Sequence, residues 1–324
     1  MMALGVRARA ALLDLVSALV TGRGVAPGDR AAVRGSLALD GFRKAARGYL
    51  VRRLLHPGSR QDDVTLLVPA LDGLFTIAVS SGDLAVGEEI LRSGRYEPHI
   101  VAFYRRHLRP GMTVLDVGAN VGFHALHAAA LVGPSGRVFA VEPDPRNVAL
   151  LRLSLSLPGA PAPVEVIEAA LSDADGTLVL SDLGNRANSG ARFTHGDRRT
   201  LERLVHGPDP RFSTARGLRW DGMHVDTRID LVKIDIEGSE PRAVRGMAQS
   251  LERHRPTVLS EFAPSNLRTL GGIDPDAYVA WFLERGYTSS VLEEGSGALA
   301  SAGRAEIAAR LGTRHHLDLV FSPA

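Results

Sequence analysis

Cysteine is missing from this chain of 324 residues. Its absence excludes disulfide bonds, thiolate metal sites and cysteine nucleophiles, and a cytoplasmic location is the simplest expectation. Long apolar runs are missing too, because none reaches the roughly 18 residues that a membrane-spanning helix needs. The apolar stretch near the N-terminus is interrupted by Asp14, so we do not expect a signal peptide there.

Lysine is almost absent as well. Lys44 and Lys233 are the only two, and arginine supplies the other 36 of the 38 basic residues. Lys233 stands within an apolar stretch that is typical of a strand. A lysine at this position of an arginine-rich chain indicates that the larger, planar head group of arginine would not serve there.

Basic charge is concentrated at the N-terminus, where residues 1–60 carry 11 Lys and Arg against three Asp, while the remainder carries 27 basic against 33 acidic residues. We expect a basic helical extension and linker over residues 1–63, and the main domain over residues 64–324. An apolar stripe along residues 42–55 would suit an anionic membrane surface. Packing on the acidic domain, or on a second subunit in a homo-oligomer, is the alternative that we favour. The net charge of only +2 and the scarcity of interleaved aromatic residues argue against a nucleic-acid partner.

The stretch from Thr113 to Pro143 has the pattern of a strand, a glycine turn, a helix and a second strand. The first strand is expected over Thr113–Val117, the helix over Phe123–Leu131 and the second strand over Arg137–Val141. Such a βαβ unit binds its ligand beyond the carboxyl ends of its strands. Residues 116–122 are therefore predicted to lie at a binding crevice.

The residues of this crevice favour a cationic nucleoside. Gly118 and Gly122 give a G-x-x-x-G spacing that lacks the third glycine of the dinucleotide fingerprint, which counts against NAD and FAD. Glu142 follows the second strand, where a carboxylate suits the two hydroxyls of a ribose. Asp116 would sit badly beside a pyrophosphate but well near an ammonium or sulfonium group.

A second group of charged residues lies in the stretch 229–240. On a strand, Lys233, Asp235 and Glu237 would share one face of an otherwise apolar segment. Charges on a central parallel strand are costly unless they pair or take part in chemistry. They predict either a catalytic centre or a buried ion network that only orders the end of the strand. Together with neighbouring carboxylates they could also hold Mg²⁺, although the spacing does not require a metal.

Several motifs occur in order over residues 71–321, and together they resemble the FkbM-type family of class I S-adenosylmethionine-dependent methyltransferases. They are Tyr96-Glu97, LRPGMTVLDVGANVGFHAL, VFAVEPDPRN, EAALSD, the NSG at Asn188–Gly190, and IDLVKIDIEGSE at Ile229–Glu240.

The resemblance implies an α/β fold of the class I (Rossmann-like) type, with a seven-stranded, mostly parallel sheet, helices on both faces and a helical N-terminal extension. Within it, residues 64–96 would form leading strands and a helix, and residues 97–324 the catalytic core. The cofactor would be S-adenosylmethionine. The residues expected to bind it are Glu97, Asp116, Gly118, Ala119, Asn120, Gly122, Glu142, Ala170, Ser172 and Asp173.

The same resemblance implies O-methylation of a hydroxyl on a sugar, glycolipid or polyketide-type natural product. Asp235 by preference, or Glu237, would take the hydroxyl proton beside Lys233. The substrate would meet Asn188, Ser189, Glu240 and Glu261. Two rivals remain: an inactive binding protein with the same fold, which the intact motif residues argue against, and a nucleotide-dependent oxidoreductase, which the missing glycine disfavours.

The remaining segments carry weaker signals. Residues 64–79 indicate two strands around Asp72-Gly73, and residues 84–96 a helix. Residues 206–224 lack periodicity and are interpreted as an insertion, either disordered or a lid in which Arg216 and Trp220 grip a substrate. Residues 295–312 are expected to be a plain connection, and His315-His316 surface histidines.

Overall fold

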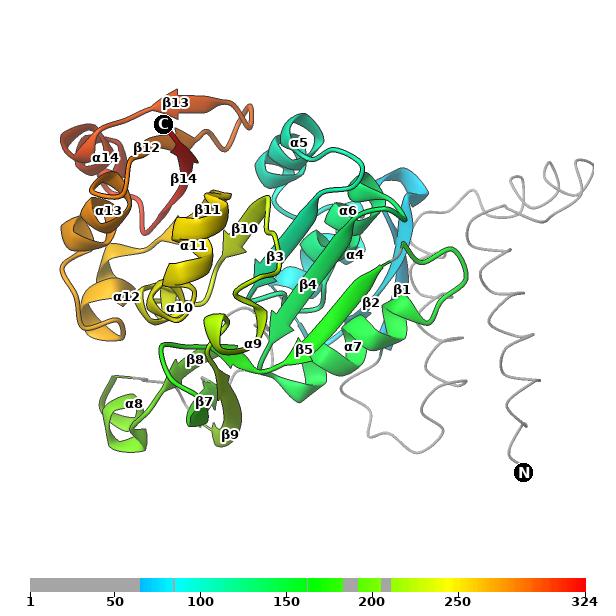
Figure 1. Cartoon of the computed structure of the whole chain (residues 1–324). Helices are drawn as coiled ribbons and strands as arrows, with labels where there is room; N and C mark the ends of the chain where they lie inside the picture. Colours follow the sequence, from blue (N-terminus) through cyan, green and yellow to red (C-terminus); the bar gives the residue numbers. More distant parts are fainter. Residues whose placement is uncertain (1–64, 84, 162, 183–191, 205–210) are drawn as a thin grey trace, which may run out of the picture.

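The computed structural model describes residues 65–324 except 84, 162, 183–191 and 205–210, and its main feature is an eight-stranded sheet (Figure 1). The strand order is β13-β12-β14-β11-β10-β3-β4-β5. The strands from β5 to β11 are parallel, whereas β14 runs antiparallel to both of its neighbours. The bounds are β3 Thr113–Val117, β4 Arg137–Glu142, β5 Val164–Glu168, β10 Leu231–Ile234, β11 Thr257–Phe262, β12 Tyr287–Leu292, β13 Leu299–Ser301 and β14 Leu317–Pro323.

This is the class I methyltransferase order with one strand added at the edge. The predicted seven strands are present, and the eighth, β13, pairs antiparallel with β12. The expectation of a plain connection over residues 295–312 was wrong, because this segment forms both β13 and α14 (Arg304–Leu311). A three-residue edge strand is too short to show a period of two in the sequence.

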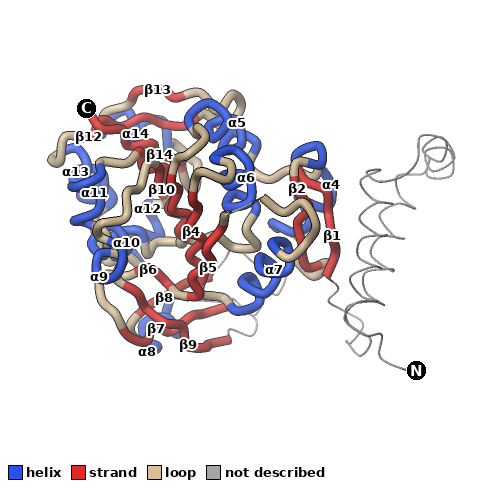
Figure 2. The backbone as a smooth tube through the Cα atoms, turned by 45° about the vertical axis from the view of Figure 1, so that its right-hand side comes forward, coloured by secondary structure: helices blue, strands red, loops and turns tan. Residues whose placement is uncertain are grey.

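The central strands are buried on both faces, so alternate residues enter two separate cores. On β3, Val114 enters one core, whereas Leu115 and Val117 enter the other. Helices cover both faces, as Figure 2 shows. The first core includes residues of α4 Val86–Ser93, α5 Pro98–His107, α6 Phe123–Val132 and α7 Pro145–Leu155, and the second residues of α10 Glu240–Gly246, α11 Ala248–His254, α12 Pro264–Thr269, α13 Pro275–Leu283 and α14.

The leading strands form a separate hairpin, as the sequence predicts. Strands β1 (Thr65–Ala70) and β2 (Phe75–Ser80) pair antiparallel around the 3-10 turn Leu71–Gly73. The hairpin packs on α7, where the buried amide of Ala78 donates a 2.8 Å hydrogen bond to Ser154 Oγ. It therefore completes the first core of the domain.

A second sheet of four strands, in the order β6-β9-β7-β8, lies beyond one end of the main sheet (Figure 1). It corrects the interpretation of residues 206–224, because residues 211–218 form the strand β9 and Trp220 is fully buried against Phe139 at a ring distance of 5.1 Å. Arg216 is exposed on β9. The bounds are β6 Ala170–Leu171, β7 Gly176–Asp182, β8 Arg192–His195 and β9 Arg211–Leu218, with α8 Arg198–Leu204 and α9 Asp221–His224 beside them.

Some predictions fall outside the described residues. They are the extension over residues 1–63, its stripe at residues 42–55, and the substrate candidates Asn188 and Ser189. The domain boundary at residue 64 likewise stays a prediction.

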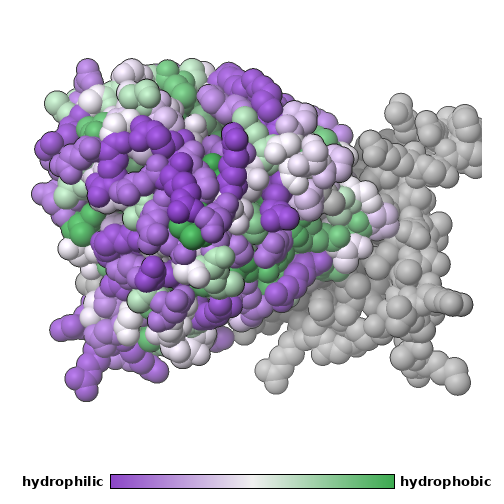
Figure 3. Space-filling model, viewed as in Figure 1, coloured by the Kyte–Doolittle hydropathy of each residue, from purple (hydrophilic) through white to green (hydrophobic). Residues whose placement is uncertain are grey.

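The face seen in Figure 3 is mostly hydrophilic. The exposed large hydrophobic side chains of the described residues are Leu74, Met223 and Leu299. Over residues 65–324, apart from the gaps named above, no helix has the length and apolar character that crossing a membrane requires.

A glycine on α10 provides a test of how tightly this helix packs against the chain that follows β6. A Cβ at Gly246 would overlap the carbonyl oxygen of Ser172, whereas a Cβ at Gly196 would meet nothing within 4 Å. We predict that Gly246→Ala lowers the free energy of unfolding by about 1–3 kcal/mol, as overpacking does, while Gly196→Ala changes it little. Denaturant unfolding of both variants measures this. Equal stabilities would show that the contact is loose.

Candidate active site

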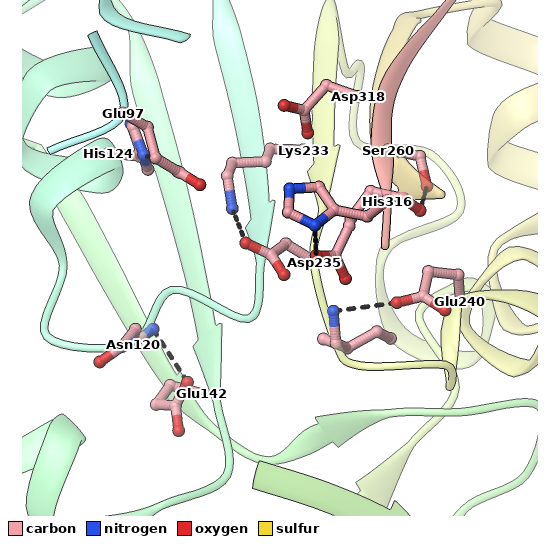
Figure 4. Close-up of polar contacts among 12 residues, drawn as sticks. Glu97, Asn120, His124, Glu142, Lys233, Asp235, Glu240, Ser260, His316 and Asp318 are labelled. Atoms are coloured by element: carbon pink, nitrogen blue, oxygen red, sulfur yellow. Dashed lines mark hydrogen bonds and ion pairs between the residues drawn. The ribbon is translucent and has the colours of Figure 1, made fainter. Parts of the chain in front are cut away.

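A cleft of about 1090 Å³, counted out to its open mouth, lies at the carboxyl ends of β3, β4, β10 and β11. This is where a parallel sheet of this order binds its ligand. One end is lined by Glu142 and Ala169–Leu171, and the other by Asp235–Glu237, Glu261 and His316. The second sheet contributes Thr194. Figure 4 shows the polar side chains of this region.

The glycine turn after β3 lines the cleft at the point where this strand end and the end of β10 approach each other. Gly118 has φ +84°, and a Cβ there would overlap the carbonyl oxygen of Asp235 at the end of β10. Gly122 has φ +92°, and a Cβ there would overlap the side chain of Leu151 on α7. Both positions therefore require glycine, for the backbone angle as well as for space.

Glu142 is held rigidly at the end of β4. Its two carboxylate oxygens accept hydrogen bonds from the backbone amides of Asn120 and Asp144, each at 2.9 Å. Burial raises the pKa of Glu142 to about 7, against the effect of these two amides. The fixed carboxylate fits the expected ribose contact, which stays a prediction.

Asp116 is a buried carboxylate that lacks well-formed hydrogen bonds from the protein. The residue is 1% exposed, and neither oxygen makes a hydrogen bond of good geometry, although the amide of Ala125 lies close enough to favour the charged form. Burial raises the pKa of Asp116 to about 6, with Lys233 opposing the shift. Buried polar groups without partners are rare, so this carboxylate fits a cationic ligand.

Lys233 and Asp235 form a buried ion pair with an Nζ–Oδ2 distance of 2.9 Å (Figure 4). Burial alone would raise the pKa of Asp235, but the charge and hydrogen bond of Lys233 outweigh it and hold the pKa below its usual value. The prediction that Lys233, Asp235 and Glu237 share one face of a strand was wrong. Strand β10 ends at Ile234, so Asp235 and Glu237 follow in the loop, where Glu237 has φ +55°. Both still line the cleft.

Glu237 and Glu261 are the protonatable carboxyls at this end. Burial, and then the charges of Asp235 and Glu240, raise the pKa of Glu237 to about 8. Asn266 Nδ2 donates a 2.9 Å hydrogen bond to Glu237 Oε2. Burial also raises the pKa of Glu261 well above its usual value, with Asp235 and Glu237 adding to the shift.

Four of the predicted site residues that the structure describes do not line the cleft, and Gly122 in the glycine turn is the first of them. Glu240 is 1% exposed and accepts hydrogen bonds from the amides of Ile236 and Gly238, so it shapes the loop from behind. Ser172 is buried, and Asp173 pairs with Arg245 at 2.9 Å. Ala170, the third cofactor-binding candidate of this segment, does line the cleft.

Two histidines that were not predicted from the sequence as site residues line the cleft. His124 Nε2 lies 2.7 Å from Glu97 Oε2, and burial lowers the pKa of His124 well below its usual value, so the ring is neutral. His316 lies 3.9 Å from Glu261 and not merely on the surface as expected. His124 follows Gly122 by two residues, which was an available signal. His316 had none, because only the return of β14 to β11 brings it here.

The described residues contain no group of three or more acidic or histidine side chains arranged to hold a metal. The predicted Mg²⁺ therefore has no support.

The fold and the cleft are those of the class I S-adenosylmethionine-dependent methyltransferases. The family model described as "Methyltransferase FkbM domain" matches residues 116–289, which is more than half of the chain. The chain belongs to the FkbM methyltransferase family.

Individual relatives are more distant. A protein-L-isoaspartate O-methyltransferase of Methanothrix thermoacetophila is 37% identical over 35% of this chain, which spans 51% of that protein. Methyltransferase sdnD of Sordaria araneosa is 27% identical over 48% of this chain and 68% of its own length. The solved structure of methyltransferase FkbM from Methylobacillus flagellatus is 15% identical, with a TM-score of 0.39 over 68% of this chain and 50% of that one.

Replacing Glu142 tests the ribose contact. We predict that Glu142→Ala weakens the binding of S-adenosylmethionine by about 1.5–3 kcal/mol, as the loss of a charged acceptor does. Glu142→Gln, which keeps the shape and one acceptor oxygen, should lose less. Unchanged affinity of both variants in titration calorimetry would refute the contact.

The raised pKa values predict that the ligand-free protein loses stability as the pH rises. Glu97 and Glu240 have pKa values of about 7 and Glu237 of about 8, against 4.5 in an unfolded chain. The folded state keeps these protons to a higher pH than the unfolded chain does. The stability that these acids contribute is therefore fully present below pH 4.5 and is lost as the pH rises through 7 to 8. Asp235, whose pKa is lowered, titrates below this window.

The measurement is the free energy of unfolding across this pH range. Glu240→Gln, which keeps the acceptor oxygen and lies outside the cleft, should flatten the decline, whereas Glu165→Gln on the exposed side of β5 should not. Stability that increases with pH would contradict the prediction.

Proposed function

We propose that the protein transfers the methyl group of S-adenosylmethionine to a hydroxyl oxygen of a sugar, glycolipid or polyketide-type natural product. One observation carries the proposal: the cleft joins a rigid carboxylate suited to ribose, at Glu142, to a buried carboxylate without a partner, at Asp116. S-adenosylmethionine supplies an electrophilic methyl group on a positively charged sulfur. The residues that would hold it are Glu97, Asp116, Gly118, Asn120, Glu142 and Ala170.

A hydroxyl acceptor must lose a proton, and the far end of the cleft offers groups that can take it. Asp235 is a weak base because Lys233 holds its pKa low. Glu237 has a pKa of about 8, close to the range in which a general base is most effective, and Asn266 orients it. We assign proton removal to Glu237. The Asp235–Lys233 ion pair would set the electrostatic environment at this end of the cleft.

Relatives support more than one acceptor. The name of sdnD specifies a methyltransferase without an acceptor, whereas the names of the isoaspartate enzymes specify O-methylation of protein L-isoaspartate. The rival to a hydroxyl is therefore a carboxylate acceptor, which needs no base. Retained Asp116, Gly118, Gly122 and Glu142 argue against an inactive binding protein.

Incubation with methyl-labelled S-adenosylmethionine and a panel of hydroxylated glycans, lipids and macrolides tests the proposal. Label in an ether linkage supports it. Label found only as a base-labile ester would favour the carboxylate rival instead.

Two isosteric variants separate the roles of the two acids. We predict that Glu237→Gln keeps stability and the affinity for the neutral product S-adenosylhomocysteine but slows single-turnover methyl transfer by about 10²–10⁴-fold, the usual share of a general base. Asp235→Asn should lower the free energy of unfolding by up to about 3–5 kcal/mol, because it removes the closest partner of a buried cation. A stable Asp235→Asn protein with wild-type affinity and no turnover would return the role of base to Asp235.

A further inference from the structure

Arginine is absent from the described wall of the cleft, although the chain contains 36 arginines. Arginine is the residue that usually recognises phosphate and carboxylate groups, through two parallel hydrogen bonds. Lys233 is the one lysine or arginine among the described lining residues, and its charge is already matched by Asp235 at 2.9 Å. The described part of the cleft thus offers no uncommitted lysine or arginine to an anion.

Acidic residues, by contrast, are concentrated there. The six acidic residues that line the cleft are Glu97, Asp116, Glu142, Asp235, Glu237 and Glu261. Three of them, Asp235, Glu237 and Glu261, stand at the end away from Glu142, where the acceptor would enter. One oxygen of Glu261 is buried without a hydrogen-bond partner, and both oxygens of Asp116 are in the same condition.

Lys233 balances the charge of Asp235, and burial keeps the protons on Glu237 and Glu261 to a higher pH than usual. An anionic acceptor would meet a like charge as these two acids ionise, in a partly buried site where Coulomb repulsion is weakly screened, and it would oppose the ionisation of Glu237 that proton removal needs. A neutral acceptor avoids this repulsion, and a protonated amine would be attracted by the same carboxylates. Repulsion of this kind is a common source of specificity. His316, at the mouth beside Glu261, is half exposed and sits within the same acidic group.

We propose that the acceptor carries no phosphate or carboxylate near its reacting hydroxyl, and is a neutral or amine-bearing polyol. The inference rests on the proposed hydroxyl methylation and adds the charge of its substrate.

The charge at the point of transfer can be measured without knowing the acceptor. Sinefungin places an ammonium where S-adenosylmethionine has its methyl-bearing sulfonium, and S-adenosylhomocysteine has a neutral sulfur there. We expect the full-length protein to bind sinefungin at least about tenfold more tightly than S-adenosylhomocysteine at a pH near 8, where Glu237 ionises.

Two variants locate the source of that preference. Glu261→Gln should lower the ratio of the two affinities several-fold, whereas Glu165→Gln, which removes the same charge from the exposed side of β5, should leave it unchanged. S-adenosylhomocysteine binding as tightly as sinefungin would overturn the proposal, and so would a ratio that Glu261→Gln does not alter.

A matched set of acceptors then tests the substrate directly. Methyl glucoside, glucosamine, glucuronate and glucose 6-phosphate differ mainly in charge, and we expect the first two to be methylated at least about tenfold faster than the last two. Faster methylation of the anionic pair overturns the inference. If hydroxyl acceptors fail altogether, the proposed function fails, while the analogue affinities still decide the charge of the site.

Discussion

The buried charge of Lys233 is the constraint on which the rest of the cleft depends. The residue is 3% exposed, and burial alone would lower its pKa, but Asp235, Asp116 and Glu97 together raise it well above the usual value. The lysine in turn favours the charged forms of the same three carboxylates. Without this cation, the mutual repulsion of Asp116 on β3, Asp235 after β10 and Glu97 before α5 would be uncompensated.

The fold places these groups because two adjacent parallel strands bring them into register. Lys233 on β10 lies opposite Asp116 on β3. The strand ends can approach only because position 118 lacks a side chain. Asp235 and Glu237 then leave the sheet in a loop that the buried Glu240 supports through two backbone amides. Sheet register, one glycine and one buried carboxylate thus fix the distances within the site.

The sequence predicts the parts of the site that depend on local pattern. The β3–α6–β4 unit, the glycine turn and Glu142 are found as expected, since strand, turn and helix signals there are contiguous. It does not predict what long-range packing decides. His316 enters the cleft through the antiparallel return of β14, and Trp220 is buried because β9 joins a second sheet. The geometry of Asp235 was also missed, because β10 stops one residue before it.

The central claim is that this acidic cleft is built around a cation on the bound cofactor. A bound sulfonium should lower the raised pKa values of Asp116 and Glu237 and so release protons. The direct test is titration calorimetry at neutral pH in buffers of different ionisation enthalpy, with S-adenosylmethionine and with S-adenosylhomocysteine. The account predicts that binding of S-adenosylmethionine releases more protons than binding of its neutral product. Equal proton exchange for the two ligands, or no binding of either, would contradict it.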